Sequence, residues 1–495
     1  MSSPLLAALR ESPLSPIEKA AHALSRFGYG PRPGEVLRLA DRGDAAIAEL
    51  IEARLSPPPR PTPPGDRFAI LELPPEKLTK AFPEHQPGEM FDISAVGAPR
   101  EILEGLILSR LDRAIQGPSE RQLAELLGEL WFDHFNVDWK KGAAKWLVAD
   151  YERNAIWPHL FGRFRELLGA VAHHPAMLFY LDNWLSTKDG FEPKNPGKQG
   201  AKAPRGLNEN YARELLELHT LGVDGGYTQA DVIAVARAFT GWTIDHPRKG
   251  GLPMFRARAH DQGEKTILGV PFPSGHGEDE GERVLDLLAK HQATAGHLAR
   301  FLCQRFVSDA PSPELVARVA ELYLKTDGDL RSLYFSIASA PELWSRPAFR
   351  AKVKTPYVAV VSAVRASGVA LDPGERAIGK RLEPMGQLPY SCQPPTGYPD
   401  LAAAWVNPGS LVARIRFALD LVGNRIPGAT MDSTPWAQVA GQGSSAERLD
   451  RLAAAVLGLR LEESTSRAIL GEAKDDDDPG RLLGLILGSP DFQRR

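Results

Sequence analysis

The sequence predicts a mainly α-helical protein: a multi-helix globular body with long irregular loops and at most a small β-hairpin. Apolar residues recur three and four positions apart through much of the chain, which places them on one face of a helix. Segments in which apolar and polar residues alternate strictly, as in strands, are few. The sequence has no repeat of fixed period, so a solenoid is not expected. With 43% hydrophobic and 24% charged residues among 495, the composition is that of a well-cored globular protein.

The chain divides into three predicted segments. Residues 1–65 comprise a helical hairpin, split by a Gly-Pro turn, and a proline-dense strap at 57–64. Residues 66–370 form a central helical domain that carries the motifs described below. Residues 371–495 are expected to supply a long irregular stretch, rich in Pro, Gly and aromatics at 386–408, and further helices packed on the same body.

Individual helices follow from the spacing of apolar residues. Helical periodicity is clearest at 100–130 and continues over 151–181. Residues 255–273 hold short apolar pieces between turn residues, a pattern that favours a small hairpin or an ordered loop. Before the irregular stretch, the pattern predicts helices at 282–290, 293–306, 313–325, 330–338 and 356–366.

The charge balance argues against nucleic-acid binding. Lys and Arg number 59 against 62 Asp and Glu, for a net charge of −3, so no global positive field gathers a polyanion. The richest basic stretch, Lys194 to Arg205, lacks interleaved aromatics and is interpreted as a solvated loop. The aspartates from Asp475 to Asp478 are likewise interpreted as an exposed loop, with a cation site as the alternative.

Cysteine content and hydropathy argue against disulfide-rich, Cys-rich zinc-binding and membrane-spanning classes of protein. With only two cysteines, Cys303 and Cys392, the chain cannot form a disulfide scaffold or a Cys-rich zinc module. A single disulfide between these two remains an alternative. The first residues lack a basic start, and Arg10 and Glu11 interrupt their apolar run before it reaches signal-peptide length. No uninterrupted apolar segment reaches the length needed to span a bilayer. As written, the chain is expected to be soluble and cytoplasmic.

The segments on either side of Gly222 carry the most information. Asn208 is a suitable N-cap and Gly222 a suitable left-handed C-terminal residue, so a helix is predicted over 209–221. The next helix begins with a pair that resembles a capping box, Thr228 and Asp231. Capping explains these polar residues without catalysis.

Charged residues gather on one side of the predicted 209–221 helix. At about 100° per residue, Glu209, Arg213 and Glu217 form one stripe, with Glu214 beside it. The plain interpretation is a solvent-facing stripe of i,i+4 ion pairs worth roughly 0.2–0.5 kcal/mol each. The alternative is a functional surface, and other polar clusters along the chain favour it.

Two of these clusters lie at helix ends and in loops, which carry function more often than helix faces do. Asp182 and Asn183 follow an apolar helix. His260 and Asp261 precede Lys265 in a loop that contains glycine. We expect the start of the 209–221 helix to converge with both clusters.

A metal site is one chemistry that these residues allow. His134 lies among aromatics at a helix end, where a histidine is more often a core residue than a ligand. Histidines and carboxylates are also the ligands of zinc, iron and manganese, so a divalent metal remains open. No short motif such as His-Glu-x-x-His is present. The residues that would have to converge are His134, Glu209, Glu214, His260 and Asp261. A carboxylate pair working as acid and base remains equally open.

Several blocks of sequence stand out together. They are Trp131 to Val137, Pro175 to Asn183, Asn208 to Gly222, Tyr227 to Val232, Phe239 to Trp242, His260-Asp261 with Lys265, and Pro394 to Pro399. These blocks resemble the signature of a bacterial family known as domain of unknown function 1800, over roughly residues 16–490. The resemblance implies that the blocks belong together but carries no reaction. It also implies that many relatives are exported and that a sulfatase-like family supplies a protein partner.

Two functional hypotheses follow. The chain lacks a Gly-x-Ser-x-Gly elbow, a phosphate-binding loop and a dinucleotide fingerprint, which disfavours the common serine hydrolases and nucleotide-binding enzymes. The first hypothesis is a hydrolase-like enzyme that acts on a saccharide or a polar ester. The second is a non-catalytic binding or assembly module in which the same polar groups form a buried network that locks helices together. In the first, the expected catalytic residues are Glu209, Glu214, Asp182, His260 and Asp261, and the expected substrate-binding residues are Arg213, Asn183, Asn208, His134, Trp242 and Lys265.

Overall fold

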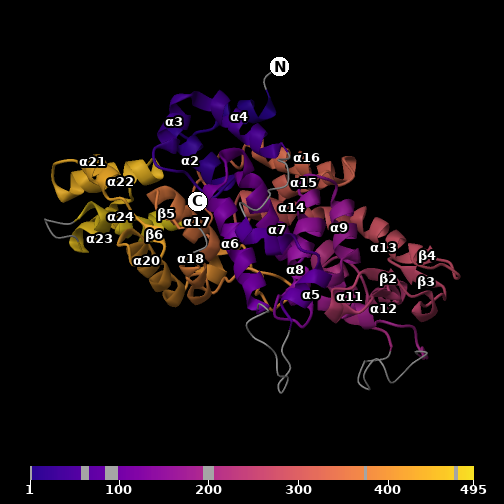
Figure 1. Ribbon diagram of the computed structural model, residues 1–495. Coiled ribbons are helices and arrows are strands. Elements are labelled where there is room, and N and C mark those ends of the chain that lie inside the picture. Colours follow the sequence, from indigo (N-terminus) through magenta and orange to yellow (C-terminus); the bar gives the residue numbers. More distant parts are fainter. Residues whose placement is uncertain (1–2, 57–65, 84–97, 193–205, 373–375, 473–477) are drawn as a thin grey trace.

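The protein is mainly α-helical, as predicted, with little sheet (Figure 1). One hydrophobic cluster runs from Leu5 to Phe492 and takes in residues from all three predicted segments, which therefore share a core. In the part of the chain that is described, the named strands form three two-stranded antiparallel sheets. The computed structural model describes residues 3–56, 66–83, 98–192, 206–372, 376–472 and 478–495.

Several expectations fall outside these ranges, whereas two others are settled within them. The proline-dense strap at 57–64, the basic stretch at 194–205 and the acidic residues 475–477 are not among the described residues. Cys303 and Cys392 are both buried and free, so the bridge that the sequence left open does not form. Within the described ranges, no helix is both long and apolar enough to cross a bilayer.

The N-terminal helices pack at the top of the view in Figure 1. Ser15 and Glu18 form a capping box, in which each side chain accepts from the other residue's backbone N–H. Lys19 crosses from the second helix to Asp44 on the fourth at 2.8 Å. The predicted hairpin is therefore part of a four-helix set: α1 (Pro4–Glu11), α2 (Pro16–Arg26), α3 (Glu35–Asp41) and α4 (Gly43–Leu55).

The next group of helices includes one that is buried on all sides. This helix, α7 (Gln122–His134), lies in the middle of the molecule, and every residue of it except Asp133 is buried. A helix in such a position serves as the centre of the core and not as an amphipathic surface helix. It packs against α4 and against α6 (Arg100–Gln116). The other helices of this part of the chain are α5 (Pro75–Ala81), α8 (Ala144–Tyr151), α9 (Phe164–His173) and α10 (Pro175–Tyr180).

The helix predicted over 209–221 is present, but its geometry changes midway. It starts as α11 (Glu209–Glu214) and continues as a π turn over Leu215–Thr220. Just after this turn, the N–H of Leu221 donates to the carbonyl of Leu216, five residues back, at 2.8 Å. The uniform rotation of 100° per residue assumed from the sequence therefore does not hold across the π turn.

The predicted ends of the helices are confirmed. The side chain of Asn208 accepts from the N–H of Asn210 at 2.9 Å and caps α11. Gly222 has a φ of 84°, the left-handed conformation that favours glycine. The capping box of Thr228 and Asp231 opens the following helix, α12 (Gln229–Ala238).

Short antiparallel strand pairs complete this part of the chain and join two later segments. The pair β3–β4 confirms the small hairpin predicted over 255–273. The other two pairs were not predicted, because strands of two or three residues are too short to show an alternating pattern. The pairs are β1 (Trp242–Ile244) with β2 (Pro253–Phe255), β3 (Lys265–Ile267) with β4 (Val270–Phe272), and β5 (Ala370–Leu371) with β6 (Ala429–Thr430).

Helices also dominate the second half of the chain. The stretch expected to be irregular over 386–408 is helical near its end, where α19 forms and α20 begins. Helices α20 and α24 pack together at one end of the molecule, opposite the hairpins (Figure 1). The helices are α13 (Asp279–Ala289), α14 (Gln292–Phe306), α15 (Pro313–Lys325), α16 (Leu330–Ala338), α17 (Pro356–Ser367), α18 (Ala377–Lys380), α19 (Ala402–Trp405), α20 (Pro408–Val422), α21 (Thr434–Ala440), α22 (Ser445–Leu457), α23 (Glu463–Glu472), α24 (Pro479–Gly488) and α25 (Pro490–Gln493).

Gly281 on α13 lies directly against the indole of Trp242. A Cβ at position 281 would come 2.5 Å from Cζ2 of that ring. We expect Gly281→Ala to lower the free energy of unfolding by about 1–3 kcal/mol through overpacking, as measured by chemical denaturation. The matched control is Gly296→Ala on α14, where nothing lies within 4 Å of the added Cβ. The control should gain roughly 0.5–1 kcal/mol, and wild-type stability in Gly281→Ala would contradict the packing.

Candidate functional site

Two of the predicted site residues, Glu209 and Arg213, face solvent. Their side chains are 40% and 43% exposed and lie 3.6 Å apart. Gln229 at the start of α12 bonds both, donating to Glu209 at 2.7 Å and accepting from Arg213 at 2.8 Å. This group links α11 to α12 on the surface, which is the plain interpretation of the charged stripe.

The two other acids of the predicted helix lie in a less polar environment. Glu214 is half-buried, and burial together with the charge of Glu217 raises its pKa. Glu217 accepts from the hydroxyl of Tyr227 at 3.2 Å. Because the π turn separates Glu217 from Arg213, the two do not form the i,i+4 pair that a regular helix would give.

The turn at 182–183 does meet the start of α11. Asn208 donates to the carbonyl of Leu181 at 3.2 Å. Asn183 is fully buried and donates to the backbone carbonyls of Phe239 and Trp242, each at 3.2 Å. Asp182 is 44% exposed and pairs outward with a lysine at 2.8 Å. The buried amide of Asn183 therefore holds chain segments together.

The predicted His260 loop forms a buried ionic network. Lys265 has no exposed side-chain surface and lies 2.7 Å from Glu280 on α13, whose side chain is 1% exposed. His260 donates from Nδ1 to the carbonyl of Thr240 at 2.8 Å, and its Nε2 lies 3.4 Å from Glu280. The charges are paired within the protein, which fixes the loop onto α13.

The last predicted residues of this region also have structural partners. Asp261 pairs with Arg237 on α12 at 2.8 Å. Trp242 is buried and stacks on His173 with the ring centroids 4.2 Å apart. None of these side chains lines the cavity described next, and among the predicted site residues only His134 does.

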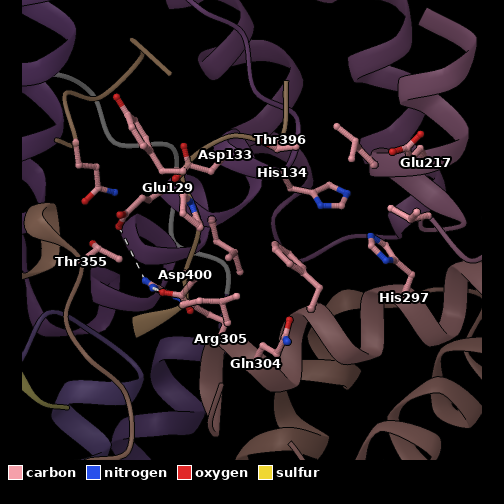
Figure 2. Close-up of a pocket in the computed structure, with 18 residues that line it drawn as sticks. Glu129, Asp133, His134, Glu217, His297, Gln304, Arg305, Thr355, Thr396 and Asp400 are labelled. Atoms are coloured by element: carbon pink, nitrogen blue, oxygen red, sulfur yellow. Dashed lines mark hydrogen bonds and ion pairs between the residues drawn. The ribbon is translucent and has the colours of Figure 1, made fainter. Parts of the chain in front are cut away.

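A cavity of about 280 Å³ lies between α7, α14, the π turn and the irregular segment at 387–401. Figure 2 shows a charged end around Arg305 and Asp400, and an opposite end where His297 and Glu217 lie. Apolar side chains, Phe301 among them, also line the cavity. The polar lining consists of Glu129, Asp133, His134, Glu217, His297, Gln304, Arg305, Thr355, Gln387, Thr396, Tyr398 and Asp400.

Arg305 dominates the charged end. It is 4% exposed, donates to Asp400 at 2.8 Å, and lies 4.0 Å from the carboxylate of Glu129. Its Nε and Nη2 have no hydrogen-bond partner within the described chain. Buried guanidinium groups form strong paired hydrogen bonds with oxygen atoms of anions. Arg305 therefore lies on the cavity wall with hydrogen-bonding capacity that the described chain does not use.

The carboxyl groups at this end have opposite proton affinities. Burial, and then the charge of Glu129, raise the pKa of Asp133 well above its usual range. Burial also opposes ionisation of Asp400, but Arg305, Lys352 and other cations outweigh it and lower the pKa of Asp400. Two carboxyl groups next to one cavity, with pKa values shifted in opposite directions, are the arrangement that separates acid from base.

The segment at 387–401 is built onto the end of α7. Gly397 has a φ of 66°, and a Cβ there would come 2.1 Å from the carbonyl oxygen of Asp133. Asn136 donates to the carbonyls of Cys392 and Pro394 at 2.8 and 2.9 Å. The backbone of Tyr398 lies close enough to the carboxyl group of Asp133 to oppose the rise of its pKa. The motif block at 131–137 and the block at 394–399 thus meet and form one wall of the cavity.

Histidines line the other end. The rings of His134 and His297 have centroids 6.3 Å apart, and His219 lies the same distance from His134 on its buried side. Burial lowers the pKa of His134 well below its usual value, lowers that of His297, and lowers that of His219 to about 3. These imidazoles are neutral at pH 7, the form that accepts a proton.

The metal alternative finds no ligand cluster. No group of three or more His, Cys, Asp or Glu side chains in the described ranges is placed to hold a metal ion. The residues proposed as ligands lie in separate places: Glu209 on the surface, His260 in the buried network and His134 on the cavity wall.

Sequence reasoning missed most of the cavity. Glu129 and Asp133 carry a signal, because they stand four residues apart in a mostly apolar helix, where acids must face either a partner or a site. Arg305 and Asp400 carry none, since they are separated by 95 positions and meet only in the folded chain. His297 lies on an ordinary amphipathic helix.

The buried pair of Lys265 and Glu280 gives a test of the network. Lys265→Met keeps the side-chain length but leaves Glu280 buried and unpaired, so we expect a loss of about 3–5 kcal/mol of unfolding free energy. Thermal and denaturant unfolding measure it. Lys325→Met is the control, since that lysine is 67% exposed in its pair with Glu321 and its removal should leave stability unchanged. Equal stability of the two variants would show that the network does not hold the loop.

Comparison with known proteins identifies the family but no activity. A family model described as a protein of unknown function, DUF1800, matches residues 22–494. No curated protein and no solved structure matches the chain. The match spans nearly the whole chain, including the blocks that form the cavity wall and the buried network, and the protein belongs to the DUF1800 family.

Proposed function

We propose that the chain is a hydrolase-like enzyme that binds a polar substrate in the cavity between α7, α14, the π turn and 387–401. The observation that carries the proposal is Arg305, buried with two unpartnered nitrogens beside Asp133, whose pKa is raised. A cationic donor and a protonated acid at one wall suit a substrate oxygen that gains charge during bond cleavage. The proposed catalytic centre lies in the cavity, whereas the sequence led us to expect it at Glu209 and the His260 loop.

The proposed roles follow from the two ends of the cavity. Asp133 gives its proton to the leaving-group oxygen as the bond to that oxygen breaks. A water molecule forms the new bond and loses a proton to the neutral imidazole of His297. Arg305 binds an oxygen of the substrate, and Asp400, which accepts from Arg305 at 2.8 Å, is a positioning residue.

The size and lining of the cavity support a small polar substrate. Its volume of about 280 Å³ is near the lower end of the usual range for ligand pockets, roughly 300–1,000 Å³. Phe301 and Tyr398 supply aromatic surface among the polar groups. These features favour a single sugar unit or a short ester over a long chain.

The second candidate is a non-catalytic binding or assembly module. The observation that favours it is the network of His260, Lys265 and Glu280, whose buried charges are already paired. In this alternative the polar motif residues lock helices together and the cavity binds without turnover. A protein partner from a sulfatase-like family rests on the family resemblance alone.

Asp133→Asn separates the two candidates. We expect it to keep the fold and to lower the hydrolysis of a responsive substrate at least roughly 100-fold, because an amide cannot replace a general acid. The assay is a panel of nitrophenyl glycosides and nitrophenyl esters, with folding checked by circular dichroism. Glu209→Gln is the control, since Glu209 lies in an exposed pair, and it should keep full activity. No hydrolysis of any panel member by the wild type, or full activity in Asp133→Asn, would favour the binding module.

The pH profile tests the assignment of acid and base. Asp133 is active while protonated, so kcat/KM should fall as pH rises through its raised pKa. His297 is active while neutral, so kcat/KM should fall as pH drops through its lowered pKa, below 6.5. His297→Gln should remove the acid-side fall and leave the alkaline one. An unchanged profile in that variant would assign the base elsewhere.

A further inference from the structure

Four cations lie buried close to one another near Asp400. Arg26 belongs to α2 and Arg414 to α20, whereas Lys354 precedes α17 and Arg495 follows α25. None is more than 4% exposed.

Three of these cations have no carboxylate partner among the described residues. Arg26 donates to the carbonyl of Ala348 at 2.6 Å. Lys354 donates to the hydroxyl of Ser362 at 2.8 Å and lies over the ring of Phe492. Neutral acceptors satisfy hydrogen bonds but do not balance a buried charge.

Arg414 and Arg495 are also incompletely satisfied. Arg414 donates to the carbonyl of Lys354 and to the side chain of Gln493, each at 2.8 Å. Arg495 lies 3.4 Å from Asp400, which is already shared with other cations. Unpartnered nitrogens remain on three of the buried guanidinium groups: Nε and Nη1 of Arg26, Nη2 of Arg414, and Nε and Nη1 of Arg495.

A small cavity of about 40 Å³ opens beside this cluster, with Lys354 and Arg495 on its wall. Arg350 and Arg494 also line it, and Asp491, the one acidic side chain among the described lining residues, pairs with Arg350 at 2.9 Å. A cavity needs roughly 10–15 Å³ on this measure to hold a water molecule. The space is therefore sufficient for an ion of a few atoms.

We propose that this cavity binds a small inorganic anion, which supplies the negative charge that the buried cations lack. Guanidinium and ammonium groups are the usual donors to phosphate and similar oxyanions. Burial and the nearby charges of Arg350, Arg495 and Arg414 lower the pKa of Lys354, which agrees with an excess of positive charge at this point. The inference does not depend on the proposed function, because it concerns a different cavity.

The test is the thermal unfolding midpoint of the full chain, titrated with sodium phosphate or sodium chloride in a buffer whose own anion is bulky. We expect a saturable rise of roughly 2–4 °C in the wild type with at least one of the two anions. Lys354→Met should lose the saturable rise and should unfold no lower than the wild type without added anion, because it relieves repulsion. Lys325→Met is the matched control, as it removes a lysine that is 67% exposed, and it should respond like the wild type.

A general salt effect is the main rival explanation, since salts also stabilise proteins by exclusion from their surface. A rise that does not saturate and is equal in the wild type and Lys354→Met would overturn the proposal. If Lys354→Met does not fold, Arg414→Met takes its place. Equilibrium dialysis of the wild type with radiolabelled phosphate and chloride gives an independent result: about one bound ion per chain supports the site, and no retained ion of either kind rejects it.

Discussion

The structure depends on three carboxyl groups on one central helix, two of them buried and the third, that of Asp133, partly buried at the end of the helix. Glu125, Glu129 and Asp133 follow one another at four-residue spacing on α7, and α7 is enclosed by other helices. Each acid therefore needs a partner inside the protein. Arg113 of α6 pairs with Glu125 at 3.0 Å, and the hydroxyl of Tyr29 donates to Glu129 at 3.2 Å. The third acid lies against the segment at 387–401, so α6, the chain after α2 and the cavity wall are all fixed against the same helix.

Much of the helical fold could be predicted from the sequence, because apolar periodicity and caps are local signals. Asn208 and Gly222 mark helix ends in both the sequence and the structure. The π turn at 215–220 could not be predicted, since one change in hydrogen-bond spacing leaves the apolar pattern nearly intact. The cavity was also missed, because Arg305 and Asp400 meet only through tertiary packing.

The motif blocks are dense in polar residues, and several of these residues hold chain segments together. Asn183, His260 and Lys265 are polar and buried, and each forms bonds that tie one chain segment to another. Sequence alone does not distinguish a polar group that holds a loop from one that meets a ligand. The difference lies in whether nitrogen or oxygen atoms remain unpartnered beside a cavity, as they do on Arg305.

The π turn after α11 changes the direction in which the following side chains point around the helix axis. Before it, Glu209 and Arg213 point to solvent; within it, Glu217 lines the cavity. A π turn is equivalent to one residue inserted into an α-helix, so the surface of one half of the helix and the interior of the other are set independently. Loss of one residue from 215–220 would restore a continuous α-helix and rotate Glu217 toward Arg213. The length of this short stretch thus determines whether the cavity has an acid at its histidine end.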